Sequence, residues 1–126
     1  MRNMILVVST LLIMNLTVVS AQTGRAQTPQ TFASFLVKFK AAVMSGDKQA
    51  VASMTKLPFM FEGEELDEYA FISKLDDLFD KQIKGCLRKA RPVRDGIYFE
   101  VTCVETTLMF RKIEGQYKFV EIGVND

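Results

Sequence analysis

The sequence contains no histidine, and carboxylates and tyrosine hydroxyls are its candidates for chemistry. The absence of histidine excludes a serine or cysteine nucleophile activated by histidine, a histidine–aspartate dyad and the usual zinc site. A carboxylate base beside a tyrosine donor remains, since burial raises the pKa of a carboxyl group into a useful range. The residues that fit this chemistry stand in or near the C-terminal strands: Glu100, Glu105, Glu121, Tyr98 and Tyr117.

Glu121 is the carboxylate with the most apolar neighbours in sequence. It lies at the mouth of an apolar pocket or on the solvent face of a half-exposed strand, and both interpretations stay open. Glu100 alternates with apolar residues and is expected to face solvent. Aromatic and methionine side chains would add a plastic pocket wall, although in a small domain they are more often core. The pocket candidates are Glu121, Tyr117, Met109, Phe59 and Phe61, and no catalytic residue is assigned.

Acidic residues crowd one short stretch: Glu62, Glu64, Glu65, Asp67 and Glu68. Clustered carboxylates can bind calcium. Their spacing does not match the ordered loop of an EF-hand, and the helix dipole stabilises carboxylates at a helix N-terminus. We therefore expect a helix entry here, no metal site and no cofactor.

Residues 1–21 are typical of a signal peptide. Arg2 precedes an apolar run, and Val19-Ser20-Ala21 supplies the small residues that a signal peptidase reads. A membrane anchor is the alternative, but the run is short and contains Asn15, so we expect no stable span after cleavage. We predict a periplasmic or secreted protein with a flexible lead-in over 22–30 and a single domain over 31–126.

The charge of the chain is close to neutral once the signal peptide is removed. Cleavage removes one basic residue from 16, which leaves 15 basic and 15 acidic residues. A chain so close to neutral gives no reason to expect nucleic acid or a membrane surface as a partner.

Cys86 and Cys103 would meet an oxidising compartment after export. If Asp95-Gly96 turns a hairpin, Cys86 falls within one or two residues of the position facing Cys103, and a bulge at Gly85 would close the gap. The alternative is two reduced core thiols. We favour the disulfide.

Three helices are predicted before the C-terminal strands. From Phe32, apolar residues recur at helical spacing, and Ser45-Gly46 ends this first helix. Asp47 caps a shorter second helix, which stops at Leu57-Pro58. The run 59–61 forms a short strand or a buried loop, and a third helix covers about 67–81.

The stretch 96–124 predicts consecutive antiparallel strands around which the helices pack. One set of alternating residues forms a buried face: Ile97, Phe99, Val101 and Cys103. The strand pattern resumes at 108–110 and again at 119–124, with Glu114-Gly115 as a hairpin turn.

The register of that hairpin has two solutions. Glutamate is a poor occupant of a two-residue turn with two positive φ angles, so we favour a three-residue loop that places Leu108 opposite Val120. The two-residue turn would place Phe110 opposite Phe119 instead, and this alternative stays open.

The segment 81–94 carries basic residues without an acidic one: Lys81, Lys84, Arg88, Lys89, Arg91 and Arg94. Gly85 and Pro92 interrupt it, which suits an edge strand guarded by charge. An anion-binding stripe is one alternative, and pairing with the acidic run, within one molecule or across a dimer, is another.

The order of these elements resembles the nuclear transport factor two-like superfamily of curved α+β rolls, in a small exported bacterial form. The resemblance rests on residues 35–54, with the link Ser45-Gly46-Asp47, and on the hairpin from Phe110 to Phe119. It implies an α+β fold with N-terminal helices packed on a curved antiparallel sheet formed mainly by the C-terminal half. It also implies a pocket without a particular reaction. A cystatin-like sheet wrapped on one helix is the nearest alternative.

These patterns favour a small exported, non-catalytic binding or interaction module. Its partner would be a small apolar ligand, another protein, or a second copy paired through the sheet. The alternative is an isomerase- or lyase-like enzyme that uses a buried carboxylate on a small hydrophobic substrate.

Overall fold

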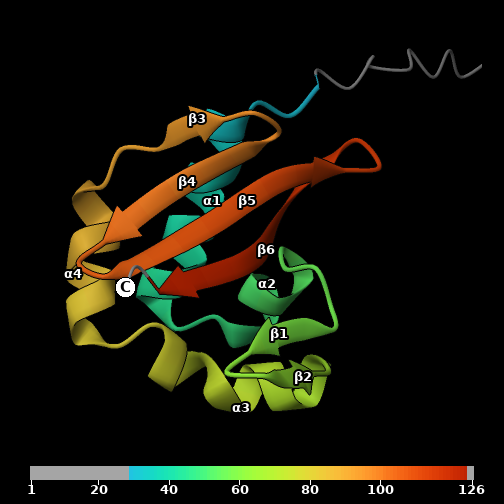
Figure 1. Cartoon of the computed structure of the whole chain (residues 1–126), viewed down its shortest axis with the longest axis vertical. Helices are drawn as coiled ribbons and strands as arrows, with labels where there is room; N and C mark the ends of the chain where they lie inside the picture. The colour runs from blue at the N-terminus through green and yellow to red at the C-terminus, as the bar shows by residue number, and fades with distance from the viewer. Residues whose placement is uncertain (1–28, 125–126) are drawn as a thin grey trace, which may run out of the picture.

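The computed structural model describes residues 29–124, so the predicted signal peptide and most of the lead-in lie outside the described residues. The architecture is α+β, as predicted (Figure 1). The helices are α1 (Phe32–Ser45), α2 (Lys48–Ser53), α3 (Glu68–Leu78) and α4 (Lys81–Lys89). A two-stranded sheet contains β1 (Phe59–Phe61) and β2 (Glu64–Leu66). A four-stranded antiparallel sheet contains β3 (Val93–Asp95), β4 (Tyr98–Cys103), β5 (Thr106–Ile113) and β6 (Gln116–Val124).

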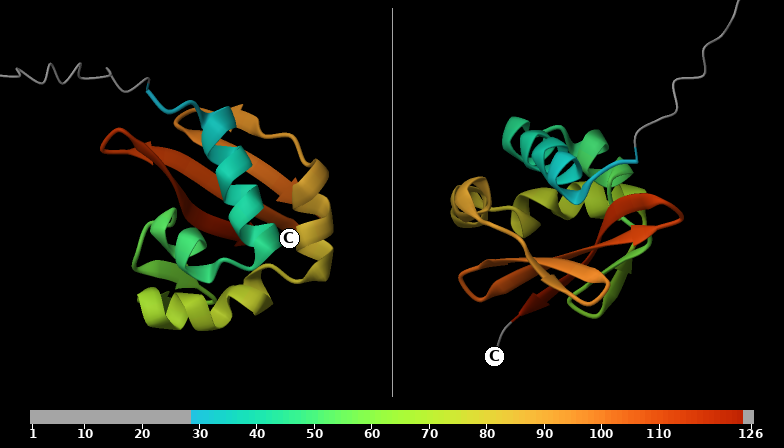
Figure 2. Two further views of the ribbon diagram at one scale, coloured as in Figure 1. Left: turned by 180° about the vertical axis from the view of Figure 1, so that it is seen from behind. Right: turned by 90° about the horizontal axis from the view of Figure 1, so that it is seen from above.

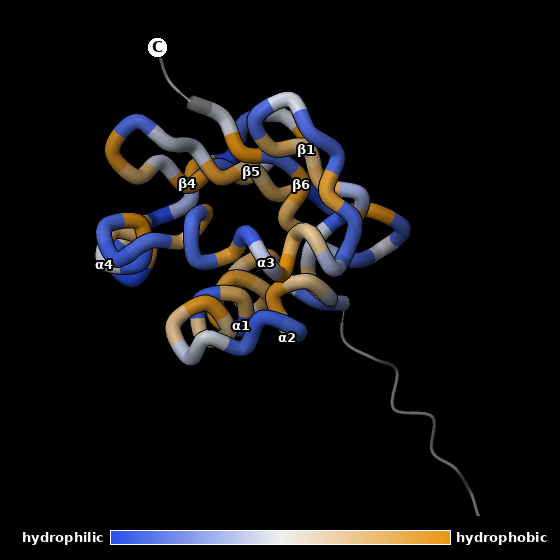
Figure 3. The backbone as a smooth tube through the Cα atoms, turned by 90° about the horizontal axis from the view of Figure 1, so that it is seen from below, coloured by the Kyte–Doolittle hydropathy of each residue, from blue (hydrophilic) through white to orange (hydrophobic). Residues whose placement is uncertain are grey.

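The helices lie on one face of the four-stranded sheet, which we call the inner face. Figure 1 is viewed from the opposite, outer face, and α1 lies behind the strands. Seen from above, α1 and α2 lie together on the inner side (Figure 2). Apolar residues concentrate in α1 and the central strands, while α4 is largely hydrophilic (Figure 3). Within residues 29–124, no helix combines the length and the apolar character needed to cross a bilayer.

α1 forms where the apolar spacing predicts it. The Thr31 hydroxyl accepts a hydrogen bond from the Ser34 N–H at 3.1 Å and so satisfies one free amide of the first turn. Phe35 and Phe39 are completely buried against the sheet. Gly46 ends the helix with a φ of 71°, a left-handed conformation that glycine adopts without steric cost.

Phenylalanine rings fill the space between α1 and the inner face. Phe110 lies 5.1 Å from Phe39 and 5.4 Å from Phe119, measured between ring centroids. Phe59 of β1 reaches the same cluster, 4.9 Å from Phe119 and 5.3 Å from Phe71. The run 59–61 is therefore a strand whose first residue joins the main core.

The basic segment is a helix, so the predicted edge strand is wrong. α4 starts at Lys81 because Asp80 caps it, with the carboxylate accepting a hydrogen bond from the Ile83 N–H at 2.8 Å. Ile83 and Leu87, one turn apart, are buried, and the basic residues lie on the remaining surface. The third helix accordingly ends at Leu78 instead of continuing to residue 81.

The hairpin register is the one that the two-residue turn gives, so the favoured three-residue loop is wrong. Ile113 pairs with Gln116 and Phe110 with Phe119, while Glu114 adopts a φ of 49°. This register buries both phenylalanines completely, and burying an aromatic side chain outweighs one strained turn residue. An irregularity between Met109 and Phe110 then shifts the pairing.

Two further expectations meet at β4. The turn before it comprises Gly96-Ile97 and not Asp95-Gly96, since Asp95 pairs with Tyr98, and Ile97 is exposed instead of belonging to the buried set. The favoured disulfide is confirmed, with the Cα atoms of Cys86 and Cys103 5.6 Å apart. It links α4 to β4 and not two paired strands.

Candidate binding cleft

The five pocket candidates lie at separate places. Phe59 is fully buried in the aromatic core and lines no opening. Tyr117 contacts Phe32 and Phe99 with its ring and borders an open hollow of about 500 Å³ below the β5–β6 turn. Met109 and Glu121 face each other across β5 and β6 on the outer face. Phe61 alone reaches an apolar cleft.

That cleft opens where the α3–α4 corner meets the ends of three strands, and we call it the corner cleft. Its volume is about 420 Å³. Its apolar lining comes from β1, the two helices, the β4–β5 turn and β6: Phe61, Leu78, Ile83, Val104 and Ile122. Its polar lining is Glu62, Asp77, Asp80, Gln82, Glu105 and Thr106.

The charged residues of the corner cleft are all acidic. Glu62, Asp77, Asp80 and Glu105 are exposed, and no lysine or arginine lines the cleft. Among residues 29–124, the one ion pair within 4 Å joins Lys48 to Asp76, so none of the four carboxylates is neutralised by a salt bridge. The cleft therefore combines an apolar floor with acidic residues that form no salt bridge, of which Asp80 also caps α4.

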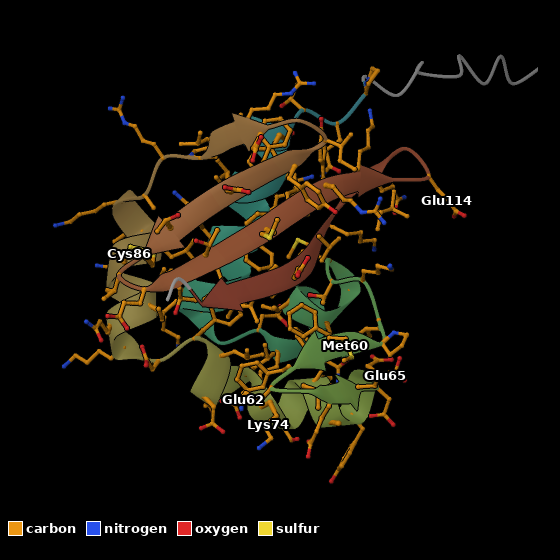
Figure 4. All side chains as sticks on the ribbon, viewed as in Figure 1. Met60, Glu62, Glu65, Lys74, Cys86 and Glu114 are labelled. Carbon is orange, nitrogen blue, oxygen red and sulfur yellow. A yellow bond between two sulfur atoms is a disulfide. The ribbon has the colours of Figure 1, made fainter. Side chains whose placement is uncertain are left out.

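Two residues that line the corner cleft lie in turns and have positive φ angles. Glu62 follows β1 with a φ of 50° and lies beside α3 (Figure 4). Val104 begins the β4–β5 turn with a φ of 60°, although it is β-branched and 64% exposed. A β-branched residue is a poor choice for this conformation, and such strain is concentrated at functional sites. Val104 contributes apolar surface at the cleft instead of burying it in the core.

The acidic side chains of residues 29–124 lie mostly at the surface. No group of three or more acidic or cysteine side chains among them is arranged to hold a metal ion. Glu100 is half-buried on the outer face, and the other described carboxylates are exposed. The arrangement at the corner cleft suits recognition: the floor takes apolar atoms, and the carboxylates attract a cation.

Sequence reasoning identified part of this cleft. Phe61 was a pocket candidate, Glu62 belonged to the acidic run, and Glu105 was a candidate carboxylate. Ile83 was missed because an edge strand was expected at 81–94. Leu78 and Ile122 were missed because sequence alone does not show that α3 and β6 meet at this cleft. The signal that could have found the rim was the Val104-Glu105 pair, since valine replaces the glycine expected at this turn position.

No protein-family model matches this chain, and a comparison with curated proteins finds no significant match. Among solved structures, the chain is similar to a de novo designed protein with a curved β-sheet. The two share 18% identity over 73% of this chain and 93% of the design, with a TM-score of 0.43.

Proposed function

We propose that this chain is a small exported, non-catalytic binding module whose corner cleft takes an apolar group that carries positive charge. The observation that carries the proposal is the pairing of an apolar floor with a rim whose charged residues are all acidic. A cationic head over an apolar tail would gain from both parts of the lining.

The packing of the inner face supports recognition over catalysis. The alternative enzyme needs a buried carboxylate in a cavity, whereas the inner face is filled by rings such as Phe39 and Phe110. The carboxylates of the corner cleft are exposed to solvent instead of being enclosed. We therefore assign them to charge recognition.

Export and kinship belong to the same proposal. The signal-peptide pattern of residues 1–21 supports a periplasmic or secreted location. The sequence of helices, short β1–β2 hairpin and closing antiparallel sheet supports kinship with the nuclear transport factor two-like rolls. The filled inner face would then place the binding site at the edge of the roll instead of inside it.

The test compares three probes with the same eight-carbon chain: octyltrimethylammonium, octanol and octanoate. Isothermal titration and amide chemical shifts of the ¹⁵N-labelled mature chain should show saturable binding of the cation, weaker binding of the alcohol and the weakest binding of the anion. The largest shifts should fall on Val104, Ile122 and their neighbours. Equal binding of all three probes, or shifts centred elsewhere, would contradict the proposal.

Matched variants separate the site from general charge. Glu62→Gln and Glu105→Gln should each weaken binding of the cation by about 1.4- to fivefold, since an exposed charge pair contributes about 0.2–1 kcal/mol. Glu114→Gln makes the same chemical change at the tip of the β5–β6 hairpin, away from Glu62 (Figure 4), and should leave binding unchanged. Added salt should weaken binding of the cation more than binding of the alcohol.

A further inference from the structure

One side of α4 carries three basic residues around a glycine. Lys81, Lys84 and Arg88 follow one another at intervals of three and four residues, so they lie on one face of the helix. Together with Gly85 and with Met44 of α1, they line a hollow of about 430 Å³, which we call the α4 hollow. It lies where the end of α1 borders α4 (Figure 2).

No described carboxylate forms a salt bridge with the basic residues of the α4 hollow. The charged residues of its lining are all basic. The ion pair within 4 Å among residues 29–124 joins Lys48 to Asp76 instead. Asp80 precedes Lys81, but its carboxylate accepts a hydrogen bond from the Ile83 N–H at 2.8 Å and caps the helix. Three cations and no carboxylate therefore give the hollow a formal charge of +3.

Two features of this surface lower the stability of α4. Like charges three or four residues apart on a helix repel each other, and glycine is one of the least favourable residues in a helix interior. Neither space nor backbone conformation requires Gly85. It is exposed, its φ lies outside the left-handed region, and apart from the neighbouring backbone of α4 no atom lies within 4 Å of the position that a Cβ would occupy. The glycine instead leaves a bare floor over which a ligand can approach the helix backbone.

From this arrangement we propose that the α4 hollow binds a small molecule that carries two or more neighbouring phosphate groups. A phosphate group has a charge of about −1.5 to −2 at pH 7, so two groups match a hollow of +3 and one group does not. Lys81 and Arg88 are seven residues apart, which is about 10 Å along the helix axis. This length gives room for phosphate groups in a row.

The lining residues supply the contacts that such a ligand needs. The Arg88 guanidinium can donate two parallel hydrogen bonds to one phosphate group, and the lysine ammonium groups act as point charges on the next. Met44 offers an apolar edge to the carbon skeleton of the ligand. The corner cleft takes Gln82 and Ile83 from another side of α4, so this proposal does not depend on the proposed function.

Isothermal titration of the mature chain in a buffer without phosphate tests the proposal, with inorganic tripolyphosphate and orthophosphate as probes. Tripolyphosphate should bind saturably and more tightly than orthophosphate, and added salt should weaken its binding. Amide chemical shifts of the ¹⁵N-labelled chain should change most over residues 81–88 and little at Val104 of the corner cleft. Sedimentation with phosphatidylglycerol vesicles tests a lipid source of the phosphate. Binding to the vesicles without binding of tripolyphosphate would overturn the small-molecule site.

Matched double variants separate the α4 hollow from the general charge of the chain. Lys84→Gln/Arg88→Gln should weaken binding of tripolyphosphate by about two- to 25-fold, if each lost charge pair counts about 1.4- to fivefold and the two effects multiply. Lys89→Gln/Arg91→Gln removes the same charge from a different hollow, which also contains Glu100, and should bind like the wild type.

Gly85→Leu tests the bare floor without any change of charge. Leucine is a much better helix former than glycine, so the variant should have a higher urea midpoint while it binds tripolyphosphate less tightly. Circular dichroism checks that it is folded, and Gly85→Ala replaces a misfolded variant, with a smaller loss of binding expected. Equal binding of the two phosphate probes, an equal loss in Lys89→Gln/Arg91→Gln, or a folded Gly85→Leu with wild-type affinity overturns the proposal.

Discussion

At the scale of single residues, Val104 has a backbone conformation that disfavours valine, and its exposed side chain gains no burial in return. Its side chain is exposed, its φ is 60°, and the turn position normally takes glycine. The position contributes apolar surface to the corner cleft instead. We therefore expect binding and stability to make opposite demands on this residue.

Val104→Gly should raise the free energy of unfolding by about 1 kcal/mol, because relief of the left-handed strain exceeds the entropy cost of glycine. Urea denaturation measures this as a higher midpoint at an unchanged slope. Val93→Gly is the matched control, because Val93 is as exposed (65%) but lies in an extended strand, and there the change should destabilise. The same Val104 variant should bind octyltrimethylammonium less tightly. A lower midpoint for Val104→Gly would refute the strain argument.

Lys40 gives a pH-dependent prediction. Its side chain extends from α1 to the end of α4, where the ammonium donates a hydrogen bond to the Ala90 carbonyl at 2.9 Å. Desolvation by burial lowers the pKa of Lys40 below 10.5. Between that lowered pKa and 10.5, the unfolded chain binds more protons at this residue than the folded chain. Titration of Lys40 therefore raises the free energy of unfolding as the pH rises through this range.

Lys40→Arg and Lys40→Met remove this titration, since arginine stays charged and methionine is neutral throughout. The free energy of unfolding of the wild type should therefore rise relative to both variants as the pH approaches 10.5. Urea titrations at a series of alkaline pH values measure the difference, in which the other titrating groups cancel. Parallel curves for the three proteins would show that Lys40 titrates alike in the folded and unfolded chain.

At the scale of elements, the sequence predicted those that local spacing determines. The apolar stripe of α1 and the Asp47 cap of α2 place both helices correctly, because helix periodicity and capping are local properties. The sequence does not predict α4, because Gly85 and Pro92 favour an interrupted edge strand, whereas the helix buries Ile83 and Leu87 one turn apart. Gly85 in fact lies on the exposed side of the helix, and apart from the neighbouring backbone of α4 no atom lies within 4 Å of the position that a Cβ would occupy.

The register of the β5–β6 hairpin shows the limit of local reasoning. Turn chemistry at Glu114 disfavoured the two-residue turn, yet the long-range gain from burying Phe110 and Phe119 decides the pairing. The corner cleft was beyond local reasoning for the same reason. Its lining comes from several segments distant in sequence, and their meeting depends on the turn between α3 and α4.

The disulfide gives the element-scale prediction, because it fastens α4 to the end of β4. Cys86 and Cys103 are 17 residues apart, and cross-linking a loop of this length stabilises by about 3 kcal/mol in the chain-entropy model. Cys86→Ala/Cys103→Ala should lower the free energy of unfolding by about that amount in urea, and reductant should destabilise the wild type but not the variant. A variant as stable as the oxidised wild type would contradict the prediction.

At the scale of the whole molecule, one aromatic core joins the two sheets and the helices. Phe119 links them: its ring contacts Phe39 of α1 and Phe59 of β1. Its backbone N–H donates to the Met54 carbonyl and its carbonyl accepts from the Lys56 N–H, both at 2.8 Å, so the segment after α2 borders β6. The small sheet therefore has no core of its own, and residues 31–124 should unfold as one unit.

Phe59→Leu tests that unity from the edge of the molecule. It removes part of a fully buried ring at β1 and should lower the free energy of unfolding by roughly 1–2 kcal/mol. If the two sheets form one unit, the slowest-exchanging amides of β5 should lose as much protection as those of β1, although β5 belongs to the other sheet. Native-state hydrogen exchange followed by NMR measures both together. Tyr69→Leu, at a side chain that is 84% exposed on α3, is the control and should leave both sheets unchanged. A loss of protection confined to β1, β2 and α3 would instead show that this part of the chain opens independently. The corner cleft would then lose its β1 wall while the larger sheet stays folded.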